Sequence, residues 1–98
     1  MLMKNKTISK GEIVSLKLIS GEELISKYIS EDTDNICIDS PLVLTISDKG
    51  QIGMIPWMIL SSTYIYTLSR NHILAMSLSN NDAKEKFIVA SKNFKMEE

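Results

Sequence analysis

Residues 14–21 read VSLKLISG, and this short stretch decides the fold. Val14, Leu16 and Leu18 alternate with polar residues, which is the two-residue period of a strand with one buried face. Gly21 then ends the alternation at a turn. The stretch therefore predicts a half-buried β-strand as the first element of the domain.

Four more strands are expected downstream, at residues 23–30, 36–46, 51–68 and 72–78. The segments between them are rich in Gly, Ser, Asn and Asp, which favour turns through side-chain hydrogen bonds or positive φ angles. These turns are at residues 20–22, 32–35, 48–50 and 69–71. Pro41 cannot donate to a strand ladder, so we expect an edge position, a bulge or a bend there.

The fourth expected strand is apolar on both faces in its first half. These apolar residues are Met54, Met58 and Leu60 on one face, and Ile55, Trp57 and Ile59 on the other. A strand with one solvated face should alternate instead. We therefore expect another element to cover the second face, either the terminal helix or a neighbouring subunit. We also expect a break in this long strand, near Pro56 or at residues 61–62.

One amphipathic helix is expected close to the C-terminus. Asn80, Asn81 and Asp82 supply a helix N-cap and an acid in the first turn. The spacing of the apolar residues that follow puts them on one stripe of a helix. They are Ala83, Phe87, Ala90 and Phe94.

These elements together predict a mostly β protein. A chain of 98 residues with 44% apolar residues has room for one domain. Five strands joined by short turns can enclose a core as a strongly bent, five-stranded antiparallel open barrel, of SH3-like, OB-like or Sm-like type. We expect an N-terminal arm at residues 1–12, the barrel at 13–78, and the C-terminal α-helix and tail at 79–98.

The composition argues against an enzyme and against bound cofactors. The single Cys37 rules out an intramolecular disulfide, and with the single His72 it cannot build a four-ligand zinc site. Neither residue has a second Cys or His to act as nucleophile and base. The four glycines are not clustered into a phosphate-binding loop. We expect no catalytic residues, no metal and no cofactor, and a buried, inert Cys37.

The N-terminal sequence and the lengths of the apolar runs indicate a cytoplasmic protein. The basic N-terminus is not followed by the apolar segment of a signal peptide. No apolar run approaches the roughly 20 residues of a membrane helix. The net charge of −1 differs from the strongly basic balance of a typical duplex-DNA binder, so a nucleic-acid contact would need a local patch.

Two segments resemble the two motifs of the Sm/LSm (Hfq-like) family. Residues 14–21 resemble the opening of the first motif, and Asp32 and Asn35, followed by residues 36–38, resemble its close. Residues 68–74 (LSRNHIL) lie where that family has its second motif. The resemblance implies an Sm-like barrel that forms a homo-oligomeric ring, in which strand four of one subunit pairs with strand five of the next. Short, divergent proteins of this family are also encoded by bacteriophages, which would put this one in a host cytoplasm.

The same resemblance implies where single-stranded RNA, or DNA, would bind. Asn35 would hydrogen-bond a base edge, and Arg70 would stack on a base or contact phosphate. Asn71 and His72 would add polar contacts, and Asp32 would brace its loop. The oligomer interface would be formed by Met54, Ile55, Trp57, Met58, Ile59, Tyr64 and Tyr66.

Several of these residues also have purely structural interpretations. His72 could be a hydrogen-bonded structural histidine, the polar residues of turn 32–35 could serve only the turn, and Trp57 could belong to the core. The position where the family stacks a base falls on Thr33 or Asp34, and the helix is C-terminal rather than N-terminal. The alternative function is therefore a non-catalytic oligomeric module, of interaction or structural (phage) type, that binds no nucleic acid.

Overall fold

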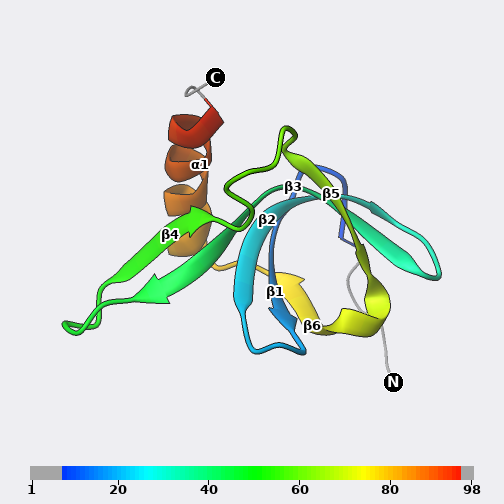
Figure 1. Ribbon diagram of the computed structural model, residues 1–98, viewed down its shortest axis with the longest axis horizontal. Helices are drawn as coiled ribbons and strands as arrows, with labels where there is room; N and C mark the ends of the chain where they lie inside the picture. The colour runs from blue at the N-terminus through cyan, green and yellow to red at the C-terminus, as the bar shows by residue number, and fades with distance from the viewer. Residues whose placement is uncertain (1–7, 96–98) are drawn as a thin grey trace.

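An antiparallel sheet curls on itself, and one helix lies against its outer face (Figure 1). The computed structural model describes residues 8–95. Its strands are β1 (Ile13–Leu18), β2 (Glu23–Glu31), β3 (Asn35–Ile46), β4 (Ile52–Pro56), β5 (Ile65–Ser69) and β6 (Ile73–Leu78). Its helices are the short 3-10 helix η1 (Arg70–His72) and the α-helix α1 (Asn81–Lys95). The predicted class, a mostly β, strongly bent open barrel with a C-terminal helix, is confirmed.

The sheet runs in the order β4-β3-β2-β1-β6, and β5 also pairs with β3. The long strand β3 therefore serves two partners, β5 along residues 35–39 and β4 along residues 42–46. Between them Ser40 takes a left-handed conformation with φ 57°, just before Pro41. The backbone N–H of Ser40 donates to the carbonyl of Tyr64 at 2.7 Å. Of the edge position, bulge or bend expected at Pro41, an irregularity of the bulge or bend kind is confirmed, because the register of β2 with β3 shifts opposite this point. It lets β3 change partner from β5 to β4.

The expected fourth strand is divided at Pro56, one of the two places where a break was expected, so the sheet has six strands rather than five. β4 ends at Pro56 and β5 begins at Ile65, so residues 57–64 leave the sheet. Pro56 lacks the N–H of a ladder donor. Ser61 Oγ accepts the N–H of Thr63 at 3.2 Å, a local bond that competes with strand pairing. The N–H of Trp57 still reaches the carbonyl of Pro41, at 3.1 Å.

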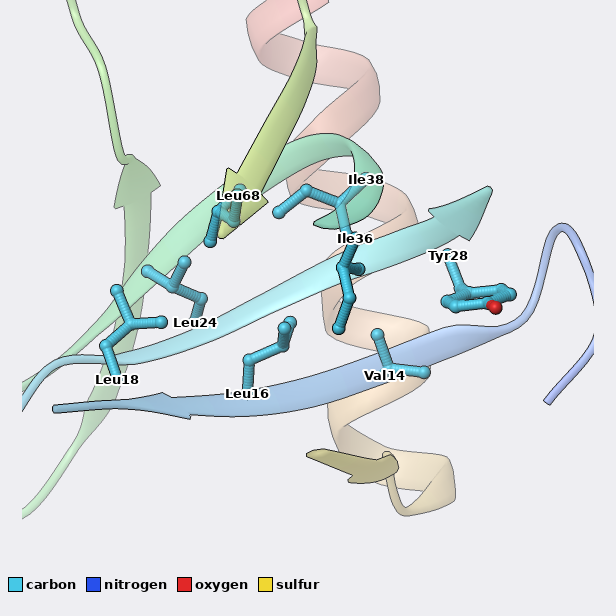
Figure 2. Packing of buried hydrophobic residues seen from close by; sticks show 8 residues of the cluster. All are labelled: Val14, Leu16, Leu18, Leu24, Tyr28, Ile36, Ile38 and Leu68. Atoms are coloured by element: carbon cyan, nitrogen blue, oxygen red, sulfur yellow. The ribbon is translucent and has the colours of Figure 1, made fainter. Parts of the chain in front are cut away.

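The barrel interior holds the larger of two hydrophobic clusters (Figure 2). It consists of Val14, Leu16, Leu18, Leu24, Tyr28, Ile36, Ile38 and Leu68. Figure 2 shows these side chains converging from the two sides of the curled sheet. The alternation read in residues 14–21 is confirmed, because all three of its apolar residues are buried here.

A second cluster joins the outer face of the sheet to the helix. It is formed by Ile13, Ile25, Leu42 and Phe87, with Leu44, Met54, Ala83, Ala90 and Phe94 packed against it. The predicted helix stripe is confirmed, since all four of its residues belong to this layer. The N-cap is also confirmed, because Asn80 Oδ1 accepts the N–H of Ala83 at 2.8 Å. The helix therefore supplies one of the two covers expected over the apolar fourth strand.

The segment before β1 is partly docked. Ile8 packs against the interior cluster, and Gly11 and Glu12 exchange backbone hydrogen bonds with Tyr28 at 2.8 Å. Residues 1–7 of the expected arm lie outside the described residues. The expectation of a buried Cys37 is wrong: it is half-buried, because it alternates with inward-facing neighbours and so lies on the outer face of β3.

Candidate functional site

Two turns that are far apart in the sequence meet at one end of the barrel. They are the β2–β3 turn at residues 31–35 and the helix η1, both at the right of Figure 1. The backbone N–H of Arg70 donates to the carbonyl of Asp34 at 2.9 Å. Asn35 lies opposite Ser69 in the register of β3 with β5. The sheet therefore brings together the segments that contain all the expected nucleic-acid contacts.

Asp32 organises the β2–β3 turn. Its Oδ1 accepts the backbone N–H groups of Asp34 at 2.9 Å and of Asn35 at 2.8 Å. The N–H of Asp32 in turn donates to the carbonyl of Asn35 at 2.9 Å. Hydrogen bonds to the charged form of a carboxyl group lower its pKa. The bond from the Asn35 N–H, and next the bond from the Asp34 N–H, lower the pKa of Asp32 below its ordinary 3.8. The turn thus keeps an ionised carboxylate at its tip.

The lowered pKa predicts a dependence of stability on acidity. A carboxyl group with a depressed folded-state pKa stabilises the fold above its unfolded value, 3.8, and this contribution is lost as pH falls through the lower folded value. We expect Asp32→Asn to unfold more easily than the wild type at pH 6, and the difference to shrink below pH 3.8. Urea unfolding of both proteins across pH measures it. A carboxyl pKa of 3.8 or higher for Asp32, measured by NMR titration, would contradict the prediction.

Arg70 is held by an ion pair across the two turns. Its Nη1 lies 2.7 Å from Glu31 Oε2, and the two side chains are 43% and 34% exposed. The other carboxylate oxygen, Glu31 Oε1, accepts the hydroxyl of Tyr28 at 3.1 Å. Burial, and then the bond to Glu31, raises the pKa of the Tyr28 hydroxyl. A chain of contacts thus connects the barrel interior, through Tyr28, to the exposed guanidinium.

Asn71 and His72 are exposed on η1. Ser69 Oγ caps this short helix by accepting the N–H of Asn71 at 3.3 Å. His72 accepts the N–H of Ile19 through its backbone carbonyl at 2.9 Å. Its side chain borders a groove of about 480 Å³ that Trp57 also lines. The sequence did not place Trp57 and His72 beside one groove.

The expected oligomer-interface residues fall into two groups. Met54 lies in the layer under the helix, while Trp57 and Tyr66 pack against the interior cluster in an edge-to-face pair with ring centroids 6.1 Å apart. The remaining ones are exposed or half-buried: Ile55, Met58, Ile59 and Tyr64. Most of the seven line an apolar groove of about 520 Å³ between the 57–64 segment and the end of α1.

The sequence missed Glu31 as the partner of Arg70, and Tyr28 as the residue that donates to Glu31. Glu31 is 39 residues from Arg70 in the chain, and no pattern in the sequence connects them. Within residues 8–95 no three His, Cys, Asp or Glu side chains gather as metal ligands. Among the described helices, none is long and apolar enough to cross a bilayer.

Comparison with known proteins gives one family match. The family model described as "Sm_like domain" matches residues 15–88, more than half of the chain. The matched span begins in β1, ends in α1 and contains both turns of the site. No match was found among curated proteins.

Proposed function

Since this chain belongs to the Sm-like family, we propose that it forms a homo-oligomeric ring that binds single-stranded RNA, or DNA, through the β2–β3 turn and η1. The observation that carries the proposal is the meeting of these turns, with Asn35 opposite Ser69 and Arg70 bonded to Asp34. The role is one of binding without catalysis.

The ring is supported by the edges of the sheet. Among the described strands, β5 pairs with β3 alone and β6 with β1 alone. A free strand edge exposes backbone donors and acceptors that can pair with another chain. Large exposed apolar side chains lie on these strands, namely Ile65, Leu74 and Leu78. In the proposed ring β5 of one copy pairs with β6 of the next, and the exposed Ile55, Met58 and Ile59 extend the interface.

A charge placed on β6 is expected to open the ring. Leu74 is 67% exposed in the single chain, so Leu74→Asp should leave the barrel folded while placing a carboxylate in the proposed interface. Sedimentation velocity should show a ring for the wild type and a single chain for the variant at micromolar concentration. Val89→Asp, on the exposed side of α1, is the control and should keep the ring. A wild type that sediments as a monomer would contradict the assembly.

The site chemistry suits unpaired bases. An amide such as that of Asn35 can donate to and accept from a base edge, and an arginine can stack its planar guanidinium on a base. Asn71 and His72 add exposed polar groups on the same short helix. Repetition of these contacts around a ring would raise the affinity for a strand that spans several subunits.

Loss of Arg70 tests the binding directly. Arg70→Ala should weaken binding of fluorescently labelled oligo-U and oligo-A by about 1–3 kcal/mol per site, the range for removal of a base-stacking side chain. Fluorescence anisotropy titrations at several salt concentrations measure this. Lys84→Ala, which removes a cation from the exposed face of α1, is the matched control. Absence of binding of either oligomer by the wild type up to about 100 μM, the weak end of non-specific affinity, would reject the function.

One observation favours a second function, an oligomeric protein-interaction module. The groove of about 520 Å³ beside α1 is lined by apolar and uncharged polar residues only, and three carboxylates surround the turn at residues 31–35. Such a surface suits a protein partner better than a polyanion. Purification distinguishes the two functions: a raised 260/280 nm absorbance ratio that nuclease treatment removes supports nucleic-acid binding, and a ratio typical of protein alone supports the module.

A further inference from the structure

We infer that Glu31 sets the ligand preference of Arg70, because it occupies the place at the guanidinium edge that a phosphate would take. The turns would then select bases over backbone. This inference rests on the proposed function and adds a specificity-determining residue to it. It comes from the contacts of Glu31, which no sequence motif singles out.

The Glu31 carboxylate has a contact on each of its two oxygens. One oxygen lies 2.7 Å from Arg70 Nη1, and the other accepts the hydroxyl of Tyr28. The Tyr28 ring is itself buried in the barrel interior. A carboxylate offers a guanidinium the same kind of charged oxygen acceptor as a phosphate. A backbone phosphate must therefore displace an anion that is also bonded to the Tyr28 hydroxyl.

The other charges near the Arg70–Glu31 ion pair also disfavour a phosphate. The carboxylates of Asp32 and Asp34 lie on the same turn, and the pKa of Asp32 is lowered, so this group is ionised at neutral pH. The faces of a guanidinium remain available for stacking when its edge is in an ion pair, and the Arg70 side chain is 43% exposed. The site therefore disfavours phosphate and leaves stacking and base-edge contacts to supply the affinity.

The test removes the charge of Glu31 and keeps its shape. Glu31→Gln retains an oxygen acceptor for Tyr28 but no longer neutralises Arg70. The probes are single-stranded oligo-U and an abasic deoxyribose-phosphate oligomer of equal length, which offers backbone without bases. Glu85→Gln makes the same charge change on an exposed position of α1 and is the matched control.

We expect Glu31→Gln to bind the abasic oligomer about two- to fivefold more tightly per site. This factor corresponds to the usual strength of an exposed ion pair, which the phosphate no longer has to break. The dependence of log K on log salt should steepen by about 0.7 for each phosphate gained. The preference for oligo-U over the abasic oligomer should fall. Adding Arg70→Ala to Glu31→Gln should abolish the gain, which separates release of Arg70 from a general loss of negative charge.

The outcomes separate this inference from the proposed function. If Glu31→Gln gains no more abasic binding than Glu85→Gln, with an unchanged salt slope, the inference is wrong even where the wild type binds oligo-U. If the wild type binds neither probe but Glu31→Gln gains abasic binding through Arg70, the inference stands and the proposed function fails. Circular dichroism of each variant verifies that it is folded.

Discussion

Phe87→Ala is expected to lower the free energy of unfolding by about 3–5 kcal/mol, the usual cost of truncating a buried aromatic residue. Phe87 is 1% exposed and lies at the centre of the layer between α1 and the sheet, against Ile13, Ile25 and Leu42. The substitution leaves a cavity that the flanking alanines of the stripe are too small to fill. Urea unfolding at neutral pH, followed by circular dichroism, measures the change.

A control on the same helix isolates the packing contribution. Val89 is 61% exposed, so Val89→Ala should change stability by no more than about 0.5 kcal/mol. Alanine is the better helix former in both substitutions, so a large loss at position 87 cannot come from helix propensity. Equal stabilities for the two variants would show that α1 does not depend on this layer.

Leu24→Ala should destabilise the protein by about 2–5 kcal/mol, because it leaves a cavity inside the barrel rather than under the helix. Leu24 is fully buried inside the barrel, and its neighbour Ile25 is fully buried on the opposite face of β2 under the helix. Because Leu24 and Ile25 are packed on opposite faces of β2 at this point of the strand, the backbone has little room to relax around a cavity. The same urea experiment measures the loss.

The control for this prediction lies in the segment between β4 and β5. Leu60 is 97% exposed, and Leu60→Ala removes the same atoms without leaving a cavity, so its effect should stay within about 0.5 kcal/mol. A Leu24→Ala protein as stable as Leu60→Ala would contradict the packing seen in Figure 2. The comparison thus tests burial rather than residue type.

Local chemistry made much of the fold predictable. The alternation at residues 14–21, the N-cap at Asn80 and the helix stripe through Phe87 each depend on residues within a few positions of one another. Pro41 predicted the bend in β3 for the same reason, since its missing N–H is a local property. The length of the fourth strand was harder to read, because apolar residues continue through residues 57–60 after the strand has ended.

The site was predictable only in part. The resemblance to the Sm-like family pointed to the turns, and Asp32 showed its turn-forming character because its hydrogen-bond partners follow it directly in the chain. The ion pair between Glu31 and Arg70 was not predictable, because it joins residues on different strands. The family resemblance assigned Arg70 to a base or a phosphate, and the structure shows its guanidinium already paired with Glu31.

By itself, the sequence determined most strands and turns, the C-terminal helix with its N-cap, the irregularity at Pro41 and the buried face of β1. These features follow from side-chain period and backbone chemistry over short distances. Only the tertiary structure decided that β3 pairs with both β4 and β5, that Leu24 and Ile25 are buried on opposite faces of β2, and that the carboxylate of Glu31 meets Arg70. These features depend on how the curled sheet closes, and closure brings together residues that no local rule relates.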